Sequence, residues 1–198
     1  MGKTLNIIDK LLSLNTYSRW GKSNRGIKAL VIHWVQNTNT SATFNRNYFE
    51  NRKFGTTDYG SAHYIVDLNG DVIRCIPDKE SAFHCGSKKI DPASGEVYTD
   101  LAREKFGQYA IDYINQSPNS VTIGIECTHI KDNGEMANET YSSLVQLSSE
   151  ICKKFSLNAD TDILLHQEIV GYKNCHKWFI DNPDKWATFK QEVKAAML

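Results

Sequence analysis

One short segment that is apolar on both faces, KALVIHWV (28–35), constrains the fold more than any other feature of this sequence. Two further apolar runs, VTIGIECTH (121–129) and DILLH (162–166), are also predicted to be strands. A strand without a polar face is covered on both sides, which is typical of central strands in α/β sheets. We therefore predict a central sheet that is flanked by helices.

The segments between these strands carry apolar residues at helical spacing. We also predict a hairpin in SAHYIVDLNGDVIRCI, because Asn69-Gly70 is a strong turn signal. The predicted helices span residues 5–14, about 40–52 with Phe44, Tyr48 and Phe49 facing inward, about 101–115, 138–156, and a closing segment from Pro183 that buries Trp186, Phe189 and Val193. Strands interleaved with helices, plus one hairpin, predict a single α/β domain over residues 1–198 with a central mixed sheet and a helical N-terminal segment, 1–20.

Composition argues against several classes of function. The 23 Lys and Arg residues balance the 23 Asp and Glu residues, so the formal net charge is zero. This balance gives no electrostatic footprint for nucleic acid, and no apolar run approaches the ~18–20 residues that insert across a membrane. The N-terminus lacks the apolar region of a signal peptide, so we expect synthesis in the cytoplasm. There the five cysteines are expected to be free thiols or metal ligands.

Two histidines end apolar strands, and a cysteine follows the second one. His33 and His166 occupy strand ends, where α/β sheets tend to build their sites, and Cys175 lies in the loop after His166. Two imidazoles, a thiolate and a water molecule complete a tetrahedral catalytic zinc site. Each histidine taken singly is more often a hydrogen-bonded structural residue, so the spacing alone leaves both interpretations open.

Glu126 and Lys173 are further candidates for chemistry. Strand alternation puts Glu126 on the same face as Gly124, which leaves room beside the carboxylate for water or substrate. The alternative is an edge-strand glutamate that points to solvent. Lys173 lies two residues before Cys175, where its ammonium group can stabilise an oxyanion, or it is an ordinary loop lysine.

Two other pairs of residues rival this set as metal ligands. Cys127 lies two residues before His129 on the apolar face of its strand, where packing is the favoured interpretation. His84 and Cys85 are direct neighbours, and their side chains point in opposite directions in an extended chain. We rank both pairs below the set of His33, His166 and Cys175.

Four motifs resemble one known family in order and character. ALVIHW, SAHYIVDLNGDVIRCIPDKESAFHCGS, NSVTIGIEC and LLHQEIVGYKNCHKWF are similar to segments of the type 2 N-acetylmuramoyl-L-alanine amidases. These zinc enzymes include endolysins and autolysins, and they share a fold with animal peptidoglycan recognition proteins. The resemblance covers residues of about 27–190, so it implies one catalytic domain of that fold.

The resemblance also implies a role for each matching residue. His33, His166 and Cys175 match the metal ligands, Glu126 the general base, and Lys173 the oxyanion-stabilising lysine. The AFHCG stretch resembles a segment that lines the substrate groove, so the expected substrate-binding residues are His84, His63 and Trp34.

The sequence departs from the family pattern at three places. His176 replaces the proline that usually follows the last ligand, so His176 is an alternative ligand to Cys175. Tyr172 lengthens the preceding loop by one residue. Ala62 stands where some members have a tyrosine, which would leave catalysis to Glu126.

The function that the resemblance implies is Zn²⁺-dependent hydrolysis of the amide between N-acetylmuramic acid and L-alanine in bacterial peptidoglycan, by a monomer, for cell lysis or wall remodelling. A non-catalytic peptidoglycan-binding module and a cytosolic muropeptide-recycling amidase are the alternatives. A phage endolysin without a signal peptide would be released through a holin-type pore.

Overall fold

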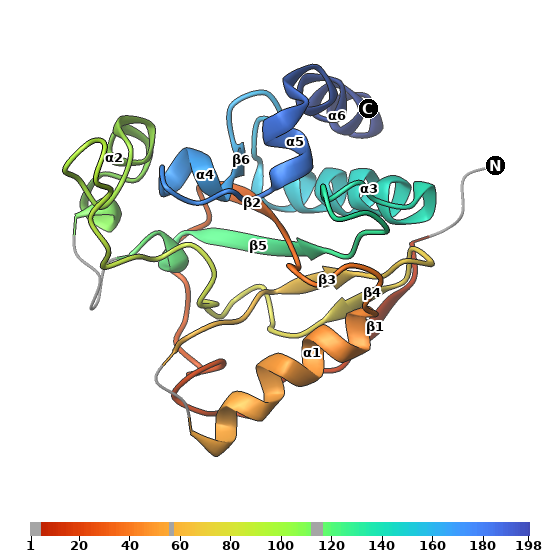
Figure 1. Cartoon of the computed structure of the whole chain (residues 1–198), viewed down its shortest axis with the longest axis horizontal. Coiled ribbons are helices and arrows are strands. Elements are labelled where there is room, and N and C mark those ends of the chain that lie inside the picture. Colours follow the sequence, from red (N-terminus) through yellow and green to blue (C-terminus); the bar gives the residue numbers. More distant parts are fainter. Residues whose placement is uncertain (1–4, 56–57, 112–116) are drawn as a thin grey trace.

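A six-stranded mixed sheet forms the centre of the computed structural model, which describes residues 5–55, 58–111 and 117–198 (Figure 1). The strand order is β1-β4-β3-β5-β2-β6, and every neighbouring pair is parallel except the β3–β4 hairpin. This confirms the predicted mixed sheet. The strands are β1 (Ile7–Asp9), β2 (Ala29–Trp34), β3 (Tyr64–Val66), β4 (Val72–Arg74), β5 (Thr122–Cys127) and β6 (Ile163–Leu165).

Helices cover both faces of the sheet, with α3 and α6 on one side and α1 on the other (Figure 1). None of the helices in the described part of the chain has the length and apolar character needed to cross a membrane. The helices are α1 (Ala42–Asn51), α2 (Asp100–Phe106), α3 (Asn138–Phe155), α4 (His166–Ile169), α5 (Lys177–Asp181) and α6 (Pro183–Ala196), with 3-10 turns at η1 (Arg52–Phe54), η2 (Gly107–Ala110) and η3 (Pro118–Ser120).

The larger hydrophobic core lies between the sheet and helices α3 and α6. Alternate residues of the central strands, such as Leu30 and Ile125, pack there against Leu144 and Phe189. Each fully buried side chain of this size contributes ~1.5–3 kcal/mol through removal of apolar surface from water. This face is continuous, and it holds the central strands in register.

The opposite face of the sheet carries two separate apolar clusters. One packs Val31 and Leu164 against α2 and α4, and the other packs Ile65 and Ile73 against α1. His33 and Glu126 are paired on the adjacent strands β2 and β5 and belong to neither cluster. His33 and Glu126 therefore lie between two apolar clusters, and this polar part of the sheet is the site described below.

The strands and helices expected near 28–35, 121–129, 162–166, 138–156 and from Pro183 onward are confirmed. The helix expected at 5–14 is wrong, because Ile7–Asp9 forms β1 in parallel register with β4. The backbone N–H groups of Lys10 and Leu12 then donate to Arg74 and Cys75 oxygens and extend this edge. An isolated helix of about ten residues is marginal, so pairing with the sheet is more stable.

The interior face of α1 also differs from the prediction. Ser41 caps the helix, since its hydroxyl accepts from the Phe44 N–H. Phe44 and Tyr48 are 56% and 58% exposed, however, and of the three aromatic residues only Phe49 packs against the buried cluster beneath. The buried positions of α1 include Glu50, which ion pairs and hydrogen bonds retain below the surface.

Two further boundaries follow from glycines. The helix expected at 101–115 ends at Phe106, because Gly107 adopts a positive φ of 56° and a 3-10 turn follows; residues 112–116 lie outside the described residues. The hairpin is confirmed, but its loop has three residues between Asp67 and Asp71, whose backbones are hydrogen bonded. Gly70 alone supplies the positive φ there, and an added Cβ would lie 2.8 Å from the Glu139 carbonyl oxygen of α3.

Candidate metal centre and active site

A groove of about 740 Å³ opens above the polar end of strands β2 and β5. Helix α1 and the turn after it supply one wall through Tyr48 and Arg52, and the loop after α4 supplies the other through Lys173 and Asn174. The deeper lining residues are His33, His84, Glu126, His166 and Cys175.

Three potential metal ligands converge at the bottom of this groove. His33 comes from β2, His166 begins α4, and Cys175 lies in the loop that returns to the start of that helix. One ligand atom from each residue lies within 4.8 Å of the others. The loop is held in place because the Gln167 N–H donates to the Cys175 carbonyl oxygen at 2.9 Å. The structure therefore brings together the set that the sequence singled out.

The hydrogen bonds around His33 leave its Nδ1 available as a ligand. The Thr122 hydroxyl donates to the Pro118 carbonyl oxygen at 2.7 Å, so Thr122 Oγ1 accepts from His84 Nε2 at 2.9 Å. His84 Nδ1 then accepts from His33 Nε2 at 3.0 Å. The remaining His33 nitrogen, Nδ1, faces the Cys175 sulfur at 3.6 Å. Such outer hydrogen bonds commonly fix the tautomer and orientation of a metal-binding histidine.

The donor set fits a zinc ion. Burial lowers the pKa of His166 to about 3, and the pKa of His33 is also lowered, mainly by burial and then by the His166 and His84 rings. Both imidazoles are therefore neutral, which is the form that coordinates metals. His166 Nε2 is buried and has no hydrogen-bond partner in the described part of the chain, so one potential ligand atom of the cluster lacks a partner. Two imidazoles and one thiol, with one position left open, match catalytic zinc sites.

Glu126 lies beside this cluster and is suited to proton transfer. It is the parallel-register neighbour of His33, and its Oε2 atom is buried and forms no hydrogen bond with the residues that the structure describes. Burial raises the pKa of Glu126 to about 7. A carboxyl group with a pKa near neutrality accepts and returns protons efficiently at that pH. Among the candidate residues, Glu126 has the strongest chemical signature of a general base.

The space beside Glu126 is occupied, whereas the sequence-based interpretation left it open. The missing side chain of Gly124 was expected to leave room for water or substrate. Instead the His84 ring fills that space, since a Cβ on Gly124 would lie 2.6 Å from His84 Cγ. The glycine therefore admits the histidine that orients His33.

Lys173 lines the groove near the cluster. Its ammonium nitrogen lies 5.6 Å from the centre of the Tyr172 ring, and its charge contributes to the low pKa of His33 and His166. The additional loop residue, Tyr172, packs against the α2 cluster, and its hydroxyl lies 2.8 Å from Ser87 Oγ. The longer loop thus still presents Lys173 and Cys175 to the groove.

The two histidines that were expected to bind substrate, His63 and His84, use their ring nitrogens in hydrogen bonds within the protein. His63 is fully buried and contacts no groove surface: Nδ1 accepts from the Gly124 N–H and Nε2 donates to the Glu80 carbonyl oxygen. The expectation that His63 contacts substrate is therefore not supported. His84 borders the groove, but His33 and Thr122 occupy both of its ring nitrogens. Trp34 does line the groove, and its indole donates to the Asn174 carbonyl oxygen.

The other candidate ligands lie outside the cluster. His176 is completely buried against Phe179 and Trp34, and the group of possible ligands contains Cys175 in its place. His129 has both ring nitrogens bound to backbone oxygens. Cys127 packs in the larger core, as expected. All five cysteines are free thiols.

Sequence reasoning missed Thr122, whose hydroxyl begins the hydrogen-bond series that reaches His33. Strand alternation already placed Thr122 on the face of Glu126, and a buried hydroxyl on that face was the available signal. The groove-wall positions Tyr48 and Arg52 had no comparable signal, because the sequence favoured an inward position for Tyr48.

A mixed α/β sheet thus brings together, in one groove, three side chains able to hold a metal ion and a buried glutamate. Residues 23–178 match the family model described as N-acetylmuramoyl-L-alanine amidase. The chain belongs to this family, which confirms the resemblance seen in the sequence motifs.

Similar proteins support the same assignment. N-acetylmuramoyl-L-alanine amidase BlyA of Bacillus subtilis (strain 168) is 31% identical over 186 residues, which cover 94% of this chain and 46% of BlyA. A probable N-acetylmuramoyl-L-alanine amidase of Bacillus licheniformis is 25% identical over 191 residues, 96% of this chain and 48% of that protein. The chain thus spans about half the length of the curated relatives it matches.

The fold is also that of solved structures. A mutant endolysin from Bacillus subtilis superposes with a TM-score of 0.67 at 19% identity, covering 96% of this chain and 99% of that one. At this identity the likeness shows a shared fold alone. It agrees with the predicted fold class, a mixed sheet flanked by helices.

Proposed function

We propose that this chain hydrolyses the amide bond between N-acetylmuramic acid and L-alanine in bacterial peptidoglycan. The observation that carries the proposal is the convergence of His33, His166 and Cys175 within 4.8 Å beside the unpaired Glu126 carboxyl, in a chain of the amidase family. His33 Nδ1, a His166 ring nitrogen and the Cys175 sulfur would hold Zn²⁺. When bound, Zn²⁺ acts as a Lewis acid that polarises the amide carbonyl and makes water more acidic.

Glu126 moves the proton in this mechanism. Its Oε2 atom has no hydrogen-bond partner among the described residues, and the carboxyl group lines the groove, where it would accept a proton from the attacking water. The same carboxyl group then delivers this proton to the departing alanine nitrogen, which must leave as an amine. Ala62 stands at the position of the alternative family tyrosine, so no phenol shares this role there.

Lys173 and the groove walls position the substrate. The Lys173 ammonium group would stabilise the negative charge that develops on the carbonyl oxygen during attack. The walls from α1 and from the loop after α4 would restrain the stem peptide so that the amide faces Glu126.

Digestion of purified cell walls tests the activity. We expect new free amino groups on L-alanine and no new reducing sugar ends, and we expect a chelator to abolish the release. Glu126→Gln is expected to remove turnover while metal stays bound. Binding to walls without release of peptides would favour a non-catalytic module and refute the hydrolase.

Metal content tests the ligand set separately from activity. Cys175→Ala is expected to lose stoichiometric zinc in elemental analysis. Cys152→Ala removes another buried thiol that packs in the core away from the cluster, and it is the matched control. Full zinc occupancy in Cys175→Ala would exclude Cys175 as a ligand.

The biological setting is proposed on the same basis. We propose a monomer that acts in lysis and reaches the wall through a pore made by another protein. Clearing of a cell suspension should then require membrane permeabilisation when the chain is produced inside the cell. Lysis without permeabilisation would contradict this route, and activity on soluble muropeptides alone would favour the recycling role.

A further inference from the structure

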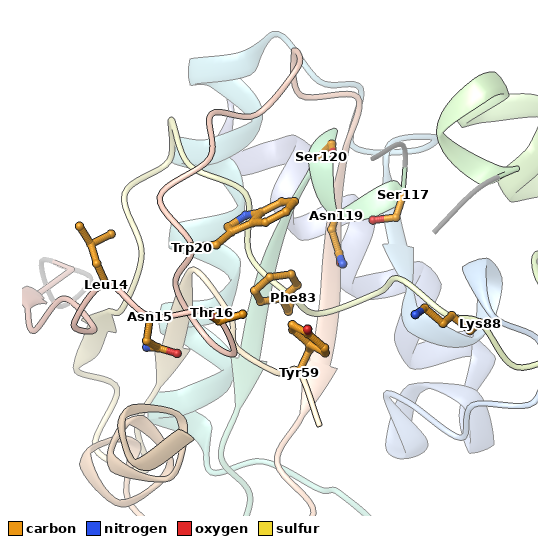
Figure 2. Close-up of a pocket in the computed structure, with 10 residues that line it drawn as sticks. All are labelled: Leu14, Asn15, Thr16, Trp20, Tyr59, Phe83, Lys88, Ser117, Asn119 and Ser120. Carbon is orange, nitrogen blue, oxygen red and sulfur yellow. The ribbon is translucent and has the colours of Figure 1, made fainter. Parts of the chain in front are cut away.

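The structure contains a second cavity of about 650 Å³, whose lining residues are drawn in Figure 2. Phe83 lines both cavities and precedes His84 of the metal-site network, so the two cavities are neighbours that share this residue. None of the proposed catalytic residues lines the second cavity. Its lining comprises Leu14, Asn15, Thr16, Trp20, Tyr59, Phe83, Lys88, Ser117, Asn119 and Ser120.

Three aromatic rings form an accessible apolar surface in this cavity. Phe83 lies between Trp20 and Tyr59, with ring centres 5.1 Å from each (Figure 2). Trp20 is 36% exposed and Tyr59 is 46% exposed, so their faces are not consumed by packing. Aromatic faces of this kind bind flat apolar surfaces of a ligand.

Asn119 adds an oriented hydrogen-bond donor. Its Oδ1 accepts from the backbone N–H groups of His84, Cys85 and Gly86 at 2.8–3.0 Å, which identifies the other amide atom as Nδ2. Asn119 is only 6% exposed, and its Nδ2 donates no hydrogen bond to the described residues. Figure 2 shows this nitrogen directed into the cavity on the side of Phe83. A donor that is fixed in direction and faces a cavity, with no partner among the described residues, is placed to bind an acceptor on a ligand.

The charges in the lining of the second cavity fit the sugar part of the proposed substrate better than the stem peptide. Among the described residues, the lining contains one ammonium group, on Lys88, and no carboxylate, while its remaining polar groups are amides, hydroxyls and the indole N–H. An N-acetylated sugar is uncharged and offers a carbonyl acceptor together with an apolar ring face. The stem peptide carries carboxylates, which match the active-site groove with its Arg52 and Lys173 better.

We propose that this cavity binds an N-acetylated sugar of the glycan strand, next to the muramic acid whose amide is cleaved. A sugar ring stacks on Trp20 and Phe83, and its acetamido oxygen accepts from Asn119 Nδ2. This assignment rests on the proposed amidase function, and it extends substrate recognition from the scissile amide to the glycan.

Binding of a β-1,4-linked tetramer of N-acetylglucosamine tests the site without requiring catalysis. Titration followed by tryptophan fluorescence and by NMR should give saturable binding, which Trp20→Ala weakens by about fivefold or more. Phe44→Ala removes an exposed aromatic ring of α1 that lines neither cavity, and it is the matched control. Equal affinity of wild type and Trp20→Ala would overturn the proposal.

Hydrolysis of two substrates with the same stem peptide then separates the two proposals. One carries a single muramic acid and the other a tetrasaccharide. We expect Trp20→Ala to raise KM for the tetrasaccharide substrate about fivefold and to leave kinetics on the short substrate unchanged. An equal effect on both substrates would assign the cavity to the peptide and refute sugar binding. Absence of cleavage by wild type would refute the amidase function, while the tetramer titration still decides the sugar site.

Discussion

Thr122→Val removes the hydroxyl that begins the hydrogen-bond series leading to His33. Thr122 is fully buried, and its Oγ1 accepts from His84 Nε2 at 2.9 Å while donating to the Pro118 carbonyl oxygen at 2.7 Å. Valine has nearly the same shape, so the perturbation is chiefly the loss of these two hydrogen bonds. The Pro118 oxygen keeps a donor in the Val121 N–H, but the His84 Nε2 atom loses its acceptor.

Two magnitudes follow from this loss. A buried N–H group left without an acceptor costs ~1–3 kcal/mol, which should appear as a lower free energy of unfolding of the metal-free protein. His84 can also shift its proton to Nδ1, and it then no longer accepts from His33 Nε2. Loss of an outer partner of a metal-binding histidine typically weakens metal affinity by ~10–100-fold.

The assay is competition for Zn²⁺ with a chromophoric chelator, together with chemical denaturation of the metal-free protein. Thr122→Ser retains the hydroxyl and is the matched control, expected to stay close to wild type in zinc affinity. If Thr122→Val binds zinc within twofold of Thr122→Ser, the hydrogen-bond series does not orient His33 and the reasoning is refuted.

Three other substitutions give separate expected outcomes. The pKa of Glu126 is about 7 in the folded metal-free protein, above the ordinary 4.5, so its stabilising contribution is complete below pH 4.5 and is lost as the pH rises towards 7. Denaturation at several pH values should therefore show that the free energy of unfolding of Glu126→Gln rises relative to that of wild type, by at most about 3 kcal/mol between pH 4.5 and 7. A difference between the two proteins that does not change with pH would contradict the raised pKa of the buried carboxyl group. Gly124→Ala should displace His84, because the added Cβ would lie 2.6 Å from the ring, and should lower both stability and zinc affinity. A variant with wild-type zinc affinity would show that the ring is free to move. Lys173→Ala should lower kcat by about 10²-fold and leave zinc content unchanged, whereas a change in KM alone would assign Lys173 to substrate binding.

The sequence by itself determined where the central strands lie and which candidate functional residues stand at their ends. The run 28–35 is apolar on both faces, which is typical of a covered central strand, and the runs 121–129 and 162–166 are largely apolar as well. The ends of these strands and the motifs around them also singled out His33, His166 and Cys175. Local pattern could propose these residues, because strand alternation and turn chemistry depend on neighbours along the chain, but by itself it left a structural role for each histidine open.

The tertiary structure decided features that depend on distant partners. Residues 5–14 have helical spacing, but the unpaired edge of β4 offers backbone hydrogen bonds that a short helix cannot equal. Tyr48 has the spacing of an inward residue, yet α1 lies so that this ring borders the groove. No local pattern specifies the free edge of a sheet or the orientation of a helix on its face.

The same division holds within the site. The sequence supplied a glycine beside Glu126 and a histidine at position 84, but it could not show that the histidine ring fills the space above the glycine. That contact joins β5 to a loop about forty residues earlier, and it determines which nitrogen of His33 faces Cys175. Residue types therefore fixed which chemistry was available, while long-range packing fixed the proton positions and geometry on which that chemistry depends.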